Sequence, residues 1–88
     1  MFKKVPSVNW KDIKPGDYII DVREANDFNA YNIKGTKNVP GSGLETYKTD
    51  KKVFVMCTTG ATSQAAVRYL RNKGIDAYNI KGGIMAYE

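Results

Sequence analysis

The chain has 88 residues, of which 42% are hydrophobic and 26% are charged, so we expect a single globular domain over residues 1–88. Its 14 basic and 9 acidic residues give a net charge of +5, but the lysines are scattered along the sequence, which argues against a nucleic-acid partner. No apolar run approaches the ~20 residues that cross a bilayer, and no apolar stretch follows the first lysines, so we expect neither membrane association nor a secretory signal.

The first half of the chain alternates between short strand patterns and helical patterns. Asn9 is a typical helix-capping residue, and Pro15-Gly16 ends a helix. Residues 18–22 are an apolar run broken only by Asp21, as in a buried parallel strand. We expect, in order, an edge strand at 3–5 ended by Pro6, a helical turn at 9–13, a strand at 18–22, a helix at 24–29, a strand at 36–39 and a turn at 40–43.

The second half of the chain contains the clearest patterns. Residues 53–56 are a second continuous apolar run, and Ala66, Val67 and Leu70 share one face of a helix predicted over 62–73, which Gly74 ends. A strand at 75–80, a turn at Gly82-Gly83 and a helical turn at 84–87 complete the chain. This alternation predicts an α/β fold with a mainly parallel sheet flanked by helices on both faces.

The single cysteine stands at the carboxyl end of the second buried strand, where ligands of parallel α/β sheets gather. Between a strand and a helix, a short loop of small residues curls so that backbone N–H groups point inward, and the helix start adds more. Such a loop stabilises a thiolate or a bound anion. The alternative is a buried, inert cysteine. The loop residues that we expect to surround the thiol are Thr58, Thr59, Gly60, Ala61, Thr62 and Ser63.

Missing residue types exclude several other chemistries. The absence of histidine excludes serine–histidine and cysteine–histidine catalysis within one chain, and with one cysteine it leaves no zinc site of the usual ligand types. No phosphate-binding glycine motif is present. A lone cysteine forms no internal disulfide, which favours a cytoplasmic protein. We also expect a monomer.

The sequence resembles the single-domain rhodaneses, a family of sulfurtransferases, over nearly all of its length. The order of four segments carries the resemblance. They are Asp21-Val22-Arg23-Glu24, the stretch from Phe28 to Pro40 (FNAYNIKGTKNVP), the loop that Cys57 opens and that leads into Ser63, and Gly82-Gly83.

The resemblance implies that Cys57 carries sulfur as a persulfide. Its thiolate would take sulfane sulfur from a small donor and pass it to an external thiol or to cyanide. The N–H groups from Thr58 to Ser63 would hold the persulfide and the leaving group, without metal or cofactor. Because the chain has no second cysteine, the acceptor would be a small thiol or a cysteine of a partner protein.

The chain departs from the family pattern at several positions. Thr62 replaces the usual arginine before the serine, and Thr58 and Thr59 stand where basic residues are common. Asn32 replaces a histidine and Tyr87 a tryptophan. The loss of cations from the loop predicts poor turnover of doubly charged thiosulfate.

Two other functions compete with sulfur transfer. A phosphatase or arsenate reductase would need an arginine six residues after the cysteine, where this chain has Ser63. A weakly active or inactive rhodanese-like binding module remains the alternative.

Asp21 and Arg23 are possible supporting residues beside the predicted site. For Asp21 we favour a structural role, satisfying buried backbone N–H groups, over one of orienting the loop. For Arg23 we favour an ion pair with Glu24 or Asp27 over binding an anionic donor. We interpret the aromatic residues as core or rim packing, namely Trp10, Tyr31, Tyr69 and Tyr87.

Overall fold

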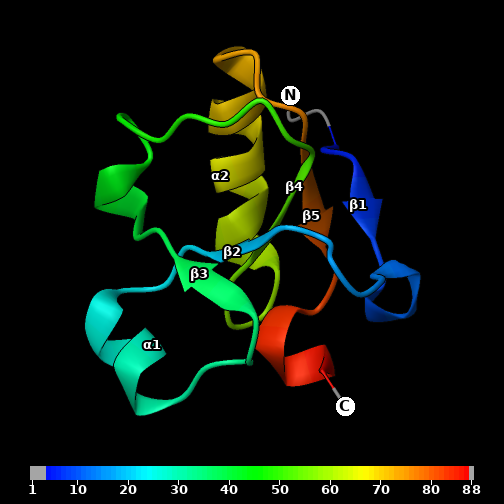
Figure 1. Ribbon diagram of the computed structural model, residues 1–88, viewed down its shortest axis with the longest axis vertical. Coiled ribbons are helices and arrows are strands. Elements are labelled where there is room, and N and C mark those ends of the chain that lie inside the picture. Colours follow the sequence, from blue (N-terminus) through cyan, green and yellow to red (C-terminus); the bar gives the residue numbers. More distant parts are fainter. Residues whose placement is uncertain (1–3, 88) are drawn as a thin grey trace.

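Five strands form one sheet in the computed structural model of the protein, which describes residues 4–87 (Figure 1). The strands are β1 (Ser7–Val8), β2 (Ile19–Asp21), β3 (Thr36–Asn38), β4 (Val53–Met56) and β5 (Ala77–Ile80). Their order across the sheet is β1-β5-β4-β2-β3, so β4 is central. Every pairing is parallel, and the carboxyl ends of the strands therefore lie at one edge of the sheet.

Different helices pack against the two faces of the sheet. They are α1 (Ala25–Ala30), α2 (Ala61–Asn72) and the short 3-10 helices η1 (Trp10–Asp12), η2 (Gly41–Gly43) and η3 (Gly83–Ala86). Helix α2 packs on β4 and β5, as Figure 1 shows, and its buried residues include Val67 and Leu70. On the other face, Trp10 of η1 and Ile84 of η3 pack against a buried cluster that includes Phe54. The predicted α/β fold with a mainly parallel sheet is confirmed.

The central strand and the long helix follow from their sequence patterns. All four residues of β4 are buried, because a central parallel strand is covered on both faces. The buried positions of α2 recur at helical spacing, which makes one face of the helix apolar. At the end of α2, Gly74 adopts φ +89° and Ile75 N–H donates to Leu70 O at 3.0 Å, so the predicted glycine stop is confirmed.

Several predicted boundaries were wrong. The first strand lies after Pro6, at Ser7–Val8. Pro6 O accepts a hydrogen bond from Asn79 N–H at 2.9 Å, which extends the pairing of this strand with β5. Lys3 of the predicted strand lies outside the described residues. Strand β5 begins at Ala77 rather than at residue 75, since Ile75 takes part in the helix stop. The last helical turn begins at Gly83. The predicted bounds of β4 are confirmed, and the bounds of the other elements differ from the predicted ones by one residue at one or both ends.

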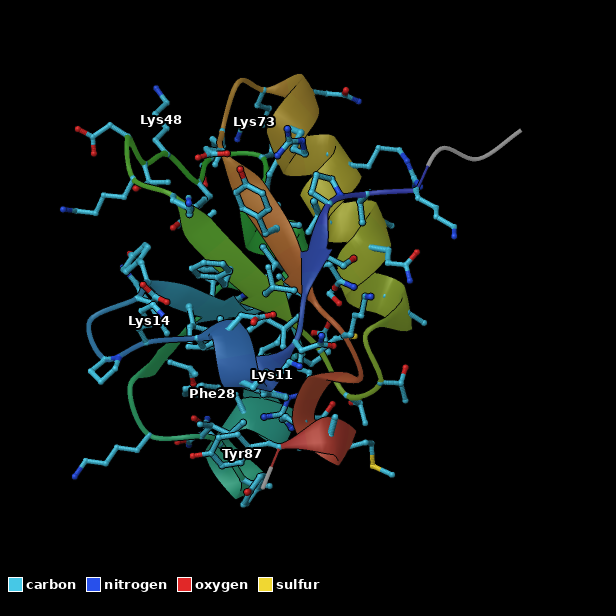
Figure 2. The ribbon with its side chains drawn as sticks, turned by 90° about the vertical axis from the view of Figure 1, so that its right-hand side faces the viewer. Lys11, Lys14, Phe28, Lys48, Lys73 and Tyr87 are labelled. Atoms are coloured by element: carbon cyan, nitrogen blue, oxygen red, sulfur yellow. The ribbon has the colours of Figure 1, made fainter. Side chains whose placement is uncertain are left out.

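Charged side chains are distributed over the surface. Figure 2 shows Lys48 and Lys73 at one end of the molecule, and Lys11 and Lys14 on a different segment. Lys73 Nζ donates to the carbonyl oxygens of Leu44, Glu45 and Tyr47 at 2.7–2.9 Å, so this charge fixes the loop before β4. Within residues 4–87, no helix is long and apolar enough to span a membrane.

Candidate active site

Cys57 lies at the carboxyl end of the central strand, immediately after Met56 of β4. The side chain is only 4% exposed. Asp21, the last residue of β2, pairs in register with Met56, and Val22 N–H donates to Met56 O at 3.0 Å. The end of β2 therefore lies beside the cysteine, as the sequence predicted from the parallel sheet.

The loop after Cys57 curls around the sulfur. Cys57 Sγ accepts hydrogen bonds from the N–H groups of Gly60 at 3.1 Å and Ser63 at 3.3 Å. Gly60 caps α2 with φ +90°, and a Cβ at this position would lie 2.9 Å from Gly82 N. The curl therefore requires glycine at residue 60, and it directs the start of α2 at the thiol.

The hydroxyl groups of the loop are not equivalent. Ser63 is buried, its Oγ lies 3.4 Å from Cys57 Sγ, and its hydroxyl donates to Oδ1 of the buried Asn79. Thr58, Thr59 and Thr62 are exposed, and no hydrogen bond joins their hydroxyls to the sulfur. Thr59 Oγ1 instead accepts from Ala61 N–H at 3.4 Å. Of the four hydroxyls near the thiol, only that of Ser63 contacts it.

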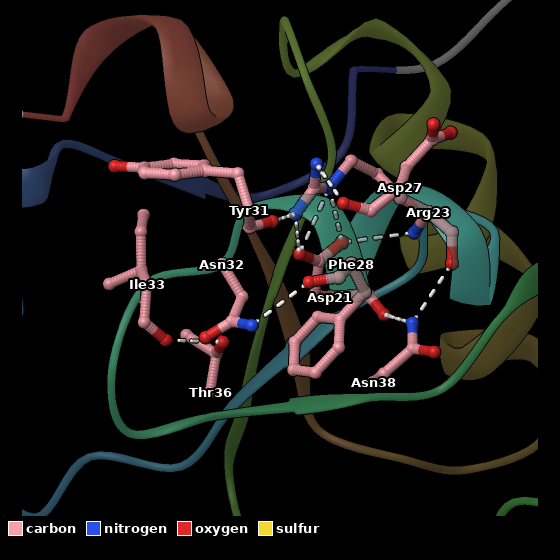
Figure 3. A network of polar contacts seen from close by, with 9 residues as sticks. All are labelled: Asp21, Arg23, Asp27, Phe28, Tyr31, Asn32, Ile33, Thr36 and Asn38. Atoms are coloured by element: carbon pink, nitrogen blue, oxygen red, sulfur yellow. Dashed lines mark hydrogen bonds and ion pairs between the residues drawn. The ribbon is translucent and has the colours of Figure 1, made fainter.

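Asp21 and Arg23 form a buried ion pair (Figure 3). Arg23 Nε and Nη2 donate to the Asp21 carboxylate at 2.8–3.1 Å, and this hydrogen bonding raises the Arg23 pKa. Arg23 also donates to the backbone oxygens of Asp27 and Tyr31, at the end of α1. The predicted pairing of Arg23 with Glu24 or the Asp27 carboxylate was wrong, because the Asp21 carboxylate, at 0% exposure, needs a counter-charge.

The structural role that we favoured for Asp21 fits these contacts. Its carboxylate accepts a hydrogen bond from the backbone N–H of Arg23 at 3.0 Å as well as those from the guanidinium. None of its hydrogen bonds reaches the loop at residues 57–63. Asn38 Nδ2 donates to the carbonyl oxygens of Asp21 and Arg23 and so fixes the backbone between β2 and α1.

The pocket in front of Cys57 is small and carries little positive charge. Its volume is about 190 Å³. The lining residues are Val22, Arg23, Glu24, Asp27, Cys57, Thr58, Thr59 and Thr62. Arg23 is neutralised by Asp21, while Glu24 and Asp27 are exposed carboxylates that form no ion pair within the described residues. The mouth of the pocket is therefore acidic. Ala61 lines a different cavity, on the side of β1.

The turn that follows β5 forms hydrogen bonds to the loop that begins at Cys57. Ile84 N–H donates to Cys57 O at 2.9 Å, and Met85 N–H donates to Thr58 O at 3.0 Å. Trp10 Nε1 donates to Gly83 O at 2.7 Å, and its ring packs edge-on against Tyr87, with the centroids 4.9 Å apart. These aromatic side chains pack and position the turn, as the sequence indicated.

The family model of the rhodanese-like domain matches residues 6–88. The chain belongs to the rhodanese-like family. An uncharacterized protein of Bacillus subtilis, YqhL, is 41% identical over 70 residues, which are 74% of this chain and 56% of the length of YqhL. The thiosulfate sulfurtransferase GlpE of Shewanella oneidensis is 34% identical over 74 residues, 78% of this chain and 73% of that protein.

A solved structure has the same fold. The rhodanese-like domain protein from Staphylococcus aureus has a TM-score of 0.78 and 28% identity, covering 94% of this chain and 91% of that one. The resemblance to rhodaneses noted in the sequence is thus confirmed. This rhodanese-like chain is similar to a protein named as a thiosulfate sulfurtransferase. It spans little more than half of the length of YqhL.

The environment of Cys57 favours its thiolate. Burial raises the pKa of the thiol, but the Ser63 hydroxyl and the backbone N–H groups of the loop lower it by more, and the net pKa lies below its ordinary value. These hydrogen-bonding groups are neutral, so the thiolate is stabilised without a loop cation.

We expect the alkylation rate of Cys57, measured as a function of pH, to have a midpoint below the ~8.5 of a free thiol. The lowered pKa means that the thiolate persists to lower pH than in a model peptide. Because the chain has one cysteine, incorporation of iodoacetamide reports on this residue alone. Ser63→Ala should move the midpoint upward, since it removes the Ser63 side-chain hydrogen bond that lowers the pKa of the thiol. A wild-type midpoint at or above the free-thiol value would contradict this prediction.

Three residues of this rhodanese-like site escaped sequence analysis. Asn79 is a buried polar residue within an apolar strand, and that mismatch was the signal for a contact with the site. Glu24 and Asp27 were treated only as partners of Arg23. No sequence pattern showed that Glu24 and Asp27 line the pocket beside Cys57 without an ion-pair partner among the described residues. Their lack of a partner there depends on the ion pair that Arg23 forms with Asp21 in the folded chain.

Proposed function

We propose that this protein is a sulfurtransferase that carries sulfane sulfur as a persulfide on Cys57 and passes it to an external thiol or to cyanide. The main support for the proposal is that Cys57 Sγ accepts hydrogen bonds from two backbone N–H groups at the start of α2. The pKa of the Cys57 thiol is lowered. Reactive cysteines of lowered pKa occur at helix N-termini, whereas buried structural cysteines are inert. The sulfurtransferase named among its relatives supports the same reaction.

The reaction consists of two displacements on sulfur. The Cys57 thiolate attacks the outer sulfur of the donor, the donor's sulfur–sulfur bond breaks, and its electron pair leaves with a thiolate or with sulfite. The acceptor thiolate then attacks the outer sulfur of the Cys57 persulfide, which restores the Cys57 thiolate. The oxidation states balance without a cofactor. The loop N–H groups stabilise negative charge on sulfur in both steps.

The partners that we propose are a small sulfur donor and an external thiol, with the protein acting as a monomer. A thiol that must remain reduced also fits a cytoplasmic location. The alternative is a rhodanese-like binding module without turnover. The hydrogen bonds to Cys57 do not favour that alternative, because a binding surface does not require a stabilised thiolate.

Transfer of sulfur from polysulfide to cyanide tests the proposal through the rate of thiocyanate formation. We expect turnover by the wild type and loss of turnover in Cys57→Ser, whose hydroxyl does not form a persulfide. The matched control is Thr46→Ala, on an exposed residue outside the pocket in front of Cys57. Equal rates for wild type and Cys57→Ser would contradict the proposal.

Donor choice follows from the neutral loop and its acidic mouth. Thiosulfate places an oxyanion group, released as sulfite, beside Glu24 and Asp27, and Arg23 is occupied by Asp21. A persulfide or polysulfide donor releases a thiolate, with little oxyanion charge beside the loop. We therefore predict higher kcat/KM for persulfide or polysulfide donors than for thiosulfate. Thr62→Arg adds a cation at the pocket rim. A charge-assisted hydrogen bond is worth about 1.5–3 kcal/mol, so kcat/KM for thiosulfate should rise roughly tenfold or more.

The control for Thr62→Arg is Thr62→Gln, which adds a neutral side chain of comparable reach. The arginine variant should improve thiosulfate more than persulfide, and the glutamine variant should improve neither selectively. Equal gains for the two donors, or a wild-type protein that already favours thiosulfate, would contradict the electrostatic explanation.

A further inference from the structure

A second hollow adjoins the Cys57 pocket. It is a groove of about 490 Å³ between the segment around η2 and the first half of α2, and it shares Val22 and Thr62 with the pocket. Buried side chains of Val22, Leu44 and Ala66 contribute to its lining, together with the exposed Ala65 and Tyr69. The side chain of Tyr69 is 42% exposed. A molecule that delivers a thiol to Cys57 therefore has an apolar surface next to it.

Three carboxylates line this combined surface, while Lys73 Nζ lies over the ring of Tyr69 in the groove, 5.6 Å from its centroid. Glu24 and Asp27 line the pocket and Glu45 lines the groove, and none of the three forms an ion pair within the described residues. The net charge of the chain is +5, so this acidic patch contrasts with the molecule as a whole. At contact distances local charges decide the interaction, because charges farther away than about 8 Å are screened at physiological salt.

We propose that the sulfur acceptor is a cysteine in an extended polypeptide segment, with an apolar side chain that enters the groove and a basic side chain that faces Glu24 and Asp27. This inference rests on the proposed function, because it names the acceptor of the same persulfide. The acceptor must be external, since the chain holds one cysteine.

A polypeptide fits this surface better than a small thiol does. A small anionic thiol such as glutathione would meet like charge at the mouth and leave the apolar groove empty. In an extended segment, residues two positions apart project from the same side, about 7 Å from each other. A cysteine and a nearby apolar residue can therefore occupy adjoining hollows at once. The basic residue supplies the complementary charge.

The test follows sulfur transfer from preloaded protein to three peptides of equal length with blocked ends and one cysteine each. The first peptide has leucine two residues before the cysteine and lysines after it. The second replaces leucine with serine, and the third replaces the lysines with glutamates. Intact mass gives the rate at which the protein loses sulfur, and each rate is divided by the cyanolysis rate of the same preparation.

We expect the first peptide to accept sulfur about tenfold faster than the third and severalfold faster than the second. Neutralising the mouth with Glu24→Gln and Asp27→Asn should reduce the preference for lysine. Filling the groove with Ala65→Trp should remove the preference for leucine. Gln64→Trp is the matched control, because Gln64 is an exposed neighbour on α2 that lines the other cavity. This control should keep both preferences.

Equal rates for the three peptides, or glutathione accepting sulfur as fast as the first peptide, would overturn the inference. Retention of the leucine preference in Ala65→Trp would overturn the role of the groove. If the protein loads sulfur and cyanide removes it, these results contradict the acceptor and leave the proposed function standing. If no sulfur loads onto Cys57, the proposed function fails, and the acceptor inference fails with it.

Discussion

Arg23→Leu is expected to lower the free energy of unfolding by about 3–5 kcal/mol, because it leaves the Asp21 carboxylate buried without a counter-charge. That carboxylate is 0% exposed, and Arg23 supplies its three side-chain hydrogen bonds. The same substitution removes the donors to the backbone oxygens of Asp27 and Tyr31, so the end of α1 loses its attachment. Urea unfolding followed by circular dichroism measures the loss.

A double variant separates the lost charge from the lost packing. In Asp21→Asn/Arg23→Leu the buried charge is gone, while the asparagine side-chain oxygen still accepts the residue 23 backbone N–H. We expect this double variant to be more stable than Arg23→Leu alone. The exposed pair of Arg71 and Asp76, 3.8 Å apart, provides the comparison, and Asp76→Asn, which removes the charge of this pair and leaves the other contacts of Arg71, should cost about 1 kcal/mol or less. Similar losses for Arg23→Leu and Asp76→Asn would contradict the importance of burial.

Gly83→Ala is expected to lower the free energy of unfolding by about 2–5 kcal/mol and to slow sulfur loading. Gly83 has φ +54°, and a Cβ there would overlap the Cys57 carbonyl oxygen and approach Thr58 at 2.9 Å. Both neighbours are backbone, so the loop itself must move. This displaces the hydrogen bonds by which Ile84 and Met85 hold the loop. Urea unfolding and the rate of persulfide formation measure the two effects.

Gly35→Ala is the matched control for Gly83→Ala. Gly35 has φ +91°, but no atom lies within 4 Å of the Cβ position. It therefore introduces backbone strain of about 1–2 kcal/mol without a collision. We expect the control to load sulfur at the wild-type rate. If Gly35→Ala and Gly83→Ala lose equal stability and both load normally, the contact between Gly83 and Cys57 does not position the loop.

Much of the sheet could be predicted, because the buried central strands carry their pattern in the sequence. Val53–Met56 is a continuous apolar run, and the observed β4 has these bounds. The short edge strand was misplaced, since Ser7–Val8 has only two residues and is defined by its pairing with β5 rather than by an apolar pattern. Because the residues of β5 that pair with β1 lie more than 70 residues later in the chain, the pairing of the two strands leaves no local signal in the sequence.

The candidate site was likewise predictable only in part. The position of Cys57 and the need for Gly60 follow from local geometry, and the structure has Cys57 directly after β4 and Gly60 at the start of α2. Arg23 could not be assigned from sequence, because three carboxylates lie close to it in the chain and only burial distinguishes Asp21 from the others. The contact between Ser63 and Asn79 joins α2 to β5 and depends on their packing.

Intact mass after incubation with polysulfide, glutathione persulfide or thiosulfate tests most directly whether Cys57 carries transferable sulfur. We expect a gain of one sulfur atom in the wild type, its removal by cyanide and no gain in Cys57→Ser. The adduct should form faster with the persulfide and polysulfide donors than with thiosulfate. Absence of the adduct with all three donors, or an adduct of the same mass on Cys57→Ser, would contradict the account.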